Sequence, residues 1–330
     1  MTLVVRDEAD VVDAQIAFHL NAGVDFVIAT DHESRDGTTE ILESYVHQGC
    51  LHLIRESGQM RDSHWRTHMA RLAATEYGAD WVINTDADEF WMPRCGSLKE
   101  VLVAAPQRFG VVWALTQHFV PRPDDGAFFA ERMVARVHAD AAINDPTSPF
   151  RPHAKAAHRA DPDVVVQFGS HSVVSRRLEP FPEWNPAGVF HFPFRSLDQY
   201  QRKTVRRARG DKALGQYVKG LQATEEGRVA DVYRTLVVDD EALARGLAGG
   251  SLVIDARLRD ALRLVRSDDG RQASGAEPAL RGVTEQAVLA VEADVLRDAN
   301  LVRLHRRLDE LAAREAAFEE RIGARPARAE

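Results

Sequence analysis

The sequence predicts an α/β fold in which a parallel sheet is covered by helices on both faces. In the first half of the chain, short apolar runs alternate with stripes of helical periodicity, which is typical of parallel sheets. Hydrophobic residues make up 45% and charged residues 28% of the 330 residues, as in ordinary soluble globular proteins. This length is sufficient for one large α/β domain with an appendage, or for two modest domains.

The elements of the first half follow one another in strict alternation. Strands are expected at Thr2–Val5, Phe26–Ala29, Leu51–Ile54 and Trp81–Ile83. Helices are expected at Val12–Leu20, from about Thr38 to Tyr45, and around Trp65–Leu72. Ligands bind beyond the carboxyl ends of the strands in such sheets, and two of these strands end in acidic clusters, at Asp31 and at Asp86.

The second half changes character twice. The middle is rich in Pro, His and aromatic residues, with strand-like pieces at Val111–Ala114, Met133–Val137 and Val164–Phe168, and with long loops at Pro121–Gly126 and Asn144–Pro152. From Leu197 onward the pattern is almost wholly helical. The last part carries a short heptad-like stripe of Leu301, Leu304, Leu308 and Leu311. We expect this stripe to be buried, either within the chain or in a homodimer.

Composition excludes several classes of function. A net charge of −8 argues against a nucleic-acid partner, and no apolar run reaches the ~18 to 20 residues of a membrane span. Cys50 and Cys95 show no metal-type spacing, which is typical of a reduced, cytoplasmic protein. One stretch of the chain is strongly basic, with Arg202, Lys203, Arg206, Arg207, Arg209 and Lys212. It is either a solvated helix face or an anion site for a diphosphate or for membrane head groups.

The strongest chemical signal is the acidic turn after the fourth expected strand. Asp86, Asp88 and Glu89 place three carboxylates within four residues, and the alternation of an extended chain lets Asp86 and Asp88 face one site. Like charges in one place cost free energy unless a cation neutralises them, and paired carboxylates suit Mg²⁺ or Mn²⁺. The alternative interpretation is a polar turn that caps the following helix.

A second signal is the loop from Asp31 to Thr38. Asp36 is expected to be the N-cap of the next helix, and Gly37 to supply a tight turn. Capping leaves Asp31 unexplained. Because Asp31 ends a strand at the ligand-binding edge, we expect its carboxylate to accept hydrogen bonds from a base or ribose.

These motifs together resemble the family-2-like glycosyltransferases of GT-A fold, in the branch whose metal motif reads Asp-x-Asp-Glu-Phe. Four blocks carry the resemblance: Val5-Arg6-Asp7-Glu8, the loop from Asp31 to Thr38, Asp86-Ala87-Asp88-Glu89-Phe90, and His191-Phe192-Pro193-Phe194-Arg195-Ser196 followed by Lys203. The resemblance implies a GT-A domain with a Rossmann-like mixed sheet over residues 1–210. Residues 211–330 would then be an α-helical C-terminal extension.

The resemblance also implies an activity, namely metal-dependent transfer from a nucleotide-diphosphate sugar, expected to be a UDP-sugar. Arg6, Glu8 and Asp31 would line the nucleotide pocket, and Arg195 or Lys203 would contact the diphosphate. Asp86 would touch both ribose and metal, Asp88 would bind Mn²⁺ or Mg²⁺, and either His171 or His191 would complete the metal shell.

The reaction implied by the resemblance inverts the anomeric carbon and needs a carboxylate to deprotonate the acceptor. Glu183, between Pro182 and Trp184, is our choice, and Asp145 and Asp124 are the alternatives. The acceptor would be a glycan, a lipid-linked sugar or a protein, and the enzyme would be cytoplasmic or peripheral at the membrane. The rival hypotheses are a non-catalytic protein that binds sugar nucleotides and a metal-dependent nucleotidyl- or phosphotransferase.

Overall fold

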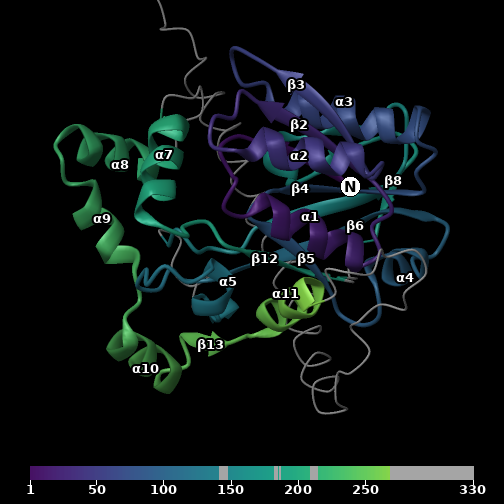
Figure 1. The fold of residues 1–330 in the computed structure, drawn as a ribbon. Helices are drawn as coiled ribbons and strands as arrows, with labels where there is room; N and C mark the ends of the chain where they lie inside the picture. The colour runs from purple at the N-terminus through teal and green to yellow at the C-terminus, as the bar shows by residue number, and fades with distance from the viewer. Residues whose placement is uncertain (141–147, 182–184, 186, 209–214, 268–330) are drawn as a thin grey trace, which may run out of the picture.

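The structure, a computed structural model, describes residues 1–140, 148–181, 185, 187–208 and 215–267 (Figure 1). The strands of the central sheet in this part of the chain are β1 (Thr2–Val5), β2 (Val27–His32), β3 (Leu51–Glu56), β4 (Trp81–Asp86), β5 (Glu89–Pro93), β6 (Phe109–His118), β8 (Ala154–Arg159), β11 (Glu179–Pro180) and β12 (Ala187–His191). The helices are α1 (Val12–Asn21), α2 (Thr38–His47), α3 (Asp62–Thr75), α4 (Leu98–Val103), α5 (Phe129–Arg132), α7 (Leu197–Ala208), α8 (Gly215–Glu225), α9 (Val229–Leu236), α10 (Asp240–Ala248) and α11 (Arg257–Ser267). None of these helices is long and apolar enough to cross a membrane.

The central sheet is mixed. Its strand order is β3-β2-β1-β4-β8-β6-β12-β5, with β11 paired to β6. The strands β1 to β4 run parallel, as the sequence predicts. The strand β8 runs antiparallel to both β4 and β6, while β12 runs parallel to β6 and antiparallel to β5. As a result, β1, β2, β4, β6 and β12 all end at one edge of the sheet.

Helices cover both faces of the sheet, because alternate residues of a strand point to opposite sides. Leu3 and Val5 of β1 enter one apolar core with α1, α2 and α11, whereas Val4 enters a second core with Trp65 and Met69 of α3. The mixed α/β fold with flanking helices is therefore confirmed.

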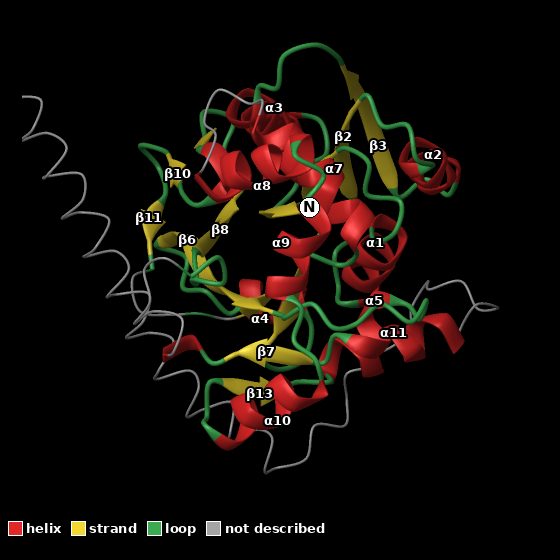
Figure 2. Ribbon diagram, turned by 90° about the vertical axis from the view of Figure 1, so that its left-hand side faces the viewer, coloured by secondary structure: helices red, strands yellow, loops and turns green. Residues whose placement is uncertain are grey.

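Smaller elements complete the molecule. The hairpin of β9 (Val165–Val166) and β10 (Val173–Val174), together with the 3₁₀ turn η1 (Phe168–Ser170), packs against the α3 side. The strand β7 (Ala135–Val137) pairs antiparallel with β13 (Leu252–Ile254), and α10 lies beside them (Figure 2). The helices α7, α8 and α9 pack on one another beside the sheet.

Two local details differ from the sequence analysis. The described part of the segment after Leu197 is almost wholly helical, as predicted, but Leu252–Ile254 forms β13 through a pairing with β7 that is remote in sequence. The N-cap of α2 is Gly37, with φ of 100°, and not Asp36. The Asp36 carboxylate still accepts the amide of Thr38, at 3.1 Å, and it also accepts the amide of Ala9, at 3.0 Å. Asp36 therefore joins two loops at the ligand-binding edge.

The helical part after residue 210 shares the core of the sheet domain. Leu258, Ala261 and Leu262 of α11 belong to the apolar core that contains α1. The predicted boundary at residue 210 and the separate status of the extension remain predictions. The leucine stripe from Leu301 to Leu311, and with it the predicted dimer contact, lies outside the described residues.

His19 of α1 covers the free edge of β5. Its Nδ1 lies 2.7 Å from the carbonyl oxygen of Gln15, and its Nε2 accepts the amide of Trp91 at 3.0 Å. Burial lowers the pKa of His19 to about 4, so the ring is neutral and acts as an acceptor for the strand.

We predict that His19 makes the fold acid-sensitive. Below the ordinary histidine pKa of about 6.5, His19 binds a proton in the unfolded chain but not in the folded one. The free energy of unfolding therefore falls as the pH decreases, until the pH approaches 4. The His19→Leu variant should be less stable than the parent at pH 7. The difference should shrink by about 2 kcal/mol at pH 5, at roughly 1.4 kcal/mol per pH unit. Urea unfolding at both pH values measures this, with His68→Leu on the exposed side of α3 as the control. Parallel stability curves for the parent and His19→Leu would contradict the prediction.

Candidate functional site

The candidate site lies at the edge where the parallel strands end. Pairing of Val5 with Asp31 and of Val4 with Asp86 sets the ends of β1, β2 and β4 side by side. At the same edge His191, the last residue of β12, pairs with His118, the last residue of β6. The acidic turn between β4 and β5 lies in the middle of this edge, as the sequence predicts.

Asp86 is neutralised by two buried cations. Arg66 of α3 donates from Nη2 to Asp86 Oδ1, and Lys155 of β8 donates from Nζ to Oδ2 at 3.1 Å. Lys155 also pairs with Glu89, at 2.6 Å, and Arg66 pairs with Asp62, at 2.9 Å. These five residues form the Asp86 network. Both Asp86 oxygens are therefore engaged by the protein itself.

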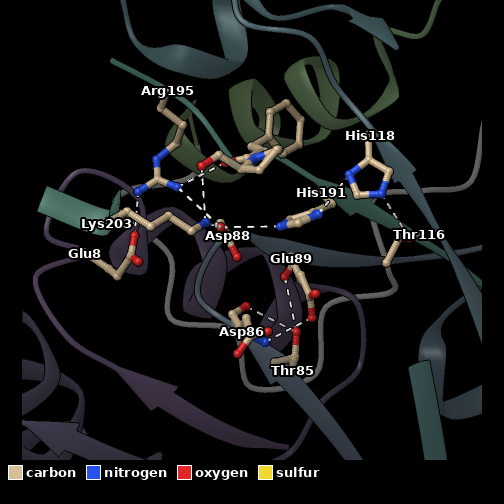
Figure 3. Close-up of polar contacts among 12 residues, drawn as sticks. Glu8, Thr85, Asp86, Asp88, Glu89, Thr116, His118, His191, Arg195 and Lys203 are labelled. Atoms are coloured by element: carbon tan, nitrogen blue, oxygen red, sulfur yellow. Dashed lines mark hydrogen bonds and ion pairs between the residues drawn. The ribbon is translucent and has the colours of Figure 1, made fainter. Parts of the chain in front are cut away.

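Asp88 belongs to a second group of charges (Figure 3). Lys203 of α7 donates from Nζ to Asp88 Oδ2 at 2.5 Å, His191 Nε2 lies 3.4 Å from this oxygen, and Arg195 Nη1 lies 3.9 Å from it. Burial by itself would raise the pKa of the Asp88 carboxyl. Lys203, His191 and Arg195 outweigh burial and hold that pKa well below its usual range, so Asp88 is ionised.

Arg195 is a buried connector and not a surface cation. Its Nη2 donates to Glu8 at 2.5 Å, its Nε donates to Asp10 at 2.7 Å, and the residue is only 1% exposed. The guanidinium thereby ties the loop after β1 to Asp88. Burial raises the pKa of Glu8, and Arg195 opposes this shift. We call this group of charges the Asp88 network; its members are Asp88, Glu8, Asp10, Arg195, Lys203 and Arg206.

A narrow cleft opens beside the acidic turn. It has a volume of about 30 Å³, room for about one water molecule, and its lining includes Asp86, Asp88 and Lys203. A wider, more open hollow of about 620 Å³ lies between the loop after β1 and α7. Arg6 and Arg206 line both spaces. Arg206 donates from Nη1 to the carbonyl oxygen of Arg6 at 2.5 Å, which holds the two cations together at the junction.

The two predicted histidine ligands are not placed alike. His191 faces Asp88, whereas His171 Nδ1 lies 3.0 Å from the carbonyl oxygen of Ala154 and its ring packs on His153, at 5.3 Å between ring centroids. The structure thus brings His191, and not His171, into contact with the acidic turn.

Asp31 organises its own loop. One oxygen accepts the amide and the hydroxyl of Ser34, at 3.2 and 2.6 Å, and the other accepts the hydroxyl of Thr39 at 2.5 Å. The sequence left this carboxylate without a structural role, and the structure supplies one. Contact of Asp31 with a base or ribose remains a prediction.

The predicted catalytic bases are not brought to the site by the described structure. Glu183 and Asp145 lie outside the described residues. Asp124 lies in the loop after β6, where its Oδ1 accepts the amide of Gly126 at 3.2 Å and lies 3.4 Å from Arg132. The identity of the base remains a prediction.

Sequence reasoning missed Arg66, Lys155 and His118. A signal existed for Arg66, because it stands beside Trp65 and three residues before Met69 on the buried stripe of α3. An arginine on a buried face requires acidic partners. Lys155 and His118 gave no such signal, because their roles depend on the mixed order of the sheet.

The described residues that could hold the predicted divalent cation lie on the Asp88 side of the turn. No group of three or more His, Cys, Asp or Glu side chains suited to a metal is present in the part of the chain that the structure describes. Magnesium-type sites for nucleotides, however, need only one or two protein ligands, because substrate phosphates complete the shell. Among the described residues, the side-chain contacts of the Asp88 carboxylate fall on Oδ2, so Oδ1 is the oxygen left for a cation. His191, whose Nε2 faces this carboxylate, would be the second ligand.

Comparison with known families gives one match. Residues 5–107 match the family model of glycosyltransferase family 92, about a third of the chain, and this stretch contains the loop from Asp31 to Thr38 and the acidic turn. The match supports a glycosyltransferase. It is to family 92, so the finer resemblance to family 2 is not confirmed. Comparison with curated proteins found no match.

Several solved structures are similar to this chain. Crystal structures of S. aureus TarS 1-349, alone and in complex with UDP-GlcNAc, share 11% and 12% identity with it, each at a TM-score of 0.32. The first comparison covers 66% of this chain and 67% of TarS 1-349, and the second covers 71% and 73%. A 4-diphosphocytidyl-2C-methyl-D-erythritol synthase shares 14% identity over 48% of this chain and 73% of that chain, at a TM-score of 0.27. Likenesses of this size say nothing about substrate or chemistry.

We predict that the ion pairs of the buried Arg195, above all the one with the buried Glu8, stabilise the fold far more than an exposed pair nearby. Arg195→Met leaves the carboxylates of Glu8 and Asp10 without their main cation and should lower the free energy of unfolding by about 3 to 5 kcal/mol. Arg202→Met breaks the exposed pair with Asp198 on α7 and should cost less than about 1 kcal/mol. Urea unfolding measures both. Equal effects of the two variants would show that Arg195 is not a structural connector.

Proposed function

We propose that this protein transfers a sugar from a nucleotide-diphosphate sugar to an acceptor hydroxyl, with inversion at the anomeric carbon and with bound Mn²⁺ or Mg²⁺. The observation that carries the proposal is the gathering of the acidic turn, His191 and the cations Lys203, Arg6 and Arg206 at one sheet edge. The turn lies within the stretch that matches glycosyltransferase family 92. A UDP-sugar is the first donor to test.

The charge balance of the site supports a cation that arrives with the donor. The Asp86 network holds three carboxylates and two cations, and the Asp88 network holds three carboxylates and three cations. Neither network has surplus positive charge for a diphosphate. A divalent cation held by Asp88 and His191 would supply it and would stabilise the leaving diphosphate as a Lewis acid.

Arg6 and Arg206 are the protein's own candidates for the diphosphate. Their side chains are 28% and 24% exposed and line the junction of the cleft with the open hollow. Arg195, by contrast, is fully engaged by Glu8 and Asp10, so we assign it a positioning role and not the predicted phosphate contact. Lys203 holds Asp88 in place and completes the positive wall of the cleft.

The nucleotide side of the site is assigned to the loop from Asp31 to Thr38. Asp31 fixes this loop through Ser34 and Thr39, and the adjacent His32 lines the cleft. For the acceptor side, Glu183 or Asp145 remains the proposed base. Family-2 membership and a glycan, lipid-linked or protein acceptor also belong to this proposal.

The reaction products test the proposal directly. The purified protein, incubated with nucleotide-diphosphate sugars and Mn²⁺, should release free nucleoside diphosphate. Release of pyrophosphate would instead indicate nucleotidyl transfer, and binding without either product would indicate a non-catalytic sugar-nucleotide-binding protein.

Asp88→Asn should abolish metal-dependent turnover. A neutral amide is a poor ligand for a hard cation and also loses the pair with Lys203, so we expect turnover to fall at least about 100-fold, or about 3 kcal/mol in transition-state free energy. Release of nucleoside diphosphate over a Mn²⁺ titration measures this, and circular dichroism verifies the fold. Asp198→Asn on the exposed face of α7 is the matched control. Unchanged Mn²⁺-dependent turnover in Asp88→Asn would refute the site.

Arg206→Gln should weaken donor binding about 10-fold or more, because a hydrogen bond to a charged group contributes roughly 1.5 to 3 kcal/mol. Arg202→Gln lies four residues earlier on the same helix and lines only the open hollow, so it serves as the control. Titration calorimetry with UDP and Mn²⁺ measures both affinities. If both variants bind like the parent, the diphosphate does not lie at this junction.

A further inference from the structure

Two histidine side chains form a row of polar contacts that ends at Asp88. His118 closes β6 and His191 closes the neighbouring strand β12, and their pairing sets them opposite each other. Their Nδ1 atoms lie 3.0 Å apart, and on its other side His191 Nε2 lies 3.4 Å from Asp88 Oδ2 (Figure 3). Nothing in the mechanism proposed above uses His118.

The partners of His118 determine which of its nitrogens carries a proton. Its Nε2 lies 2.9 Å from the carbonyl oxygen of Arg151, which can only accept, so Nε2 must donate. A neutral imidazole carries a single N–H, and in His118 this N–H is the one at Nε2. Its Nδ1 therefore bears a lone pair and acts as an acceptor.

The orientation of His191 follows from this. Two lone pairs cannot face each other at 3.0 Å, so His191 must donate from Nδ1 to His118 Nδ1. The remaining nitrogen of His191, Nε2, then faces the carboxylate of Asp88. Whenever His191 is neutral, this nitrogen bears the lone pair, so it and the carboxylate can bind one cation together.

We propose that His118 is a positioning residue that fixes the tautomer of His191, so that His191 Nε2 and Asp88 together face one divalent cation. This inference rests on the proposed function, since it deepens the assignment of the cation to Asp88. Histidine ligands of metals characteristically donate their other N–H to a neighbouring group, and loss of that group typically lowers metal affinity 10- to 100-fold.

The surroundings of His118 suit such a role. Its ring meets the ring of Phe150 edge to face, at 6.2 Å between centroids, and Thr116 Oγ1 lies 3.3 Å from Nε2. Thr116 is anchored in turn, because its hydroxyl oxygen accepts the amide of His153 at 2.7 Å. These contacts hold the His118 ring in one orientation.

The experiment compares two substitutions at one position. His118→Phe keeps a ring but removes the acceptor, whereas His118→Asn places a carbonyl oxygen near the position of Nδ1 and can accept again. His153→Phe makes the same change in a neighbouring histidine that has no contact with Asp88 in the proposed row of polar contacts, and it is the matched control. Binding of UDP is measured first by titration calorimetry. Binding of Mn²⁺ to the UDP-saturated protein follows by electron paramagnetic resonance of the free ion, and long-range ¹H–¹⁵N NMR reports the His191 tautomer, with His191→Gln to assign its signals.

We expect His118→Phe to bind Mn²⁺ at least 10-fold more weakly than the parent, while His118→Asn and His153→Phe stay within about threefold of it. In the parent, His191 should carry its proton on Nδ1, and in His118→Phe that preference should be lost. Equal Mn²⁺ affinity in the parent and His118→Phe, or a parent His191 that is protonated on Nε2, overturns the inference. A parent that binds UDP but no Mn²⁺ also overturns it and leaves nucleotide binding intact. A parent that does not bind UDP or any other sugar nucleotide overturns the proposed function itself.

Discussion

The structure depends on one electrostatic constraint, which is the neutralisation of the carboxylates crowded at the turn between β4 and β5. Asp88 and Glu89 are almost fully buried there, and unpaired charges in such a place would prevent folding. The cations come from three separate elements, with Arg66 on α3, Lys155 on β8 and Lys203 on α7. The acidic turn thus determines where these three elements must dock.

The same constraint joins stability to function. A buried ion pair is strongly destabilising when one partner is lost, so the residues around Asp88 cannot vary freely even where they touch no substrate. Arg195 shows this most clearly, because it is buried and holds Glu8 and Asp10 in the loop that carries Arg6. The positions of the surface cations therefore depend on a buried one.

Much of this arrangement could be predicted from the sequence. The four parallel strands follow from their short apolar runs, and the place of Asp86 and Asp88 follows from the rule that parallel strands end at one edge. Lys155 and His118 could not be predicted, because they reach the site only through the antiparallel insertion of β8 between β4 and β6. β13 was missed because three residues amid helical patterns become a strand only when β7 lies beside them. The roles of Glu183 and Asp145 remain predictions.

The pairing of β7 with β13 has a consequence for how the chain folds during synthesis. β7 emerges from the ribosome long before its partner, and the core beneath α1 stays open until Leu258 and Leu262 of α11 arrive. Contacts between residues so far apart in sequence are entropically costly and slow to form. Until they form, the nascent sheet exposes an apolar surface to water. That surface is covered once α11 has left the ribosome and Leu258 and Leu262 can pack into the core.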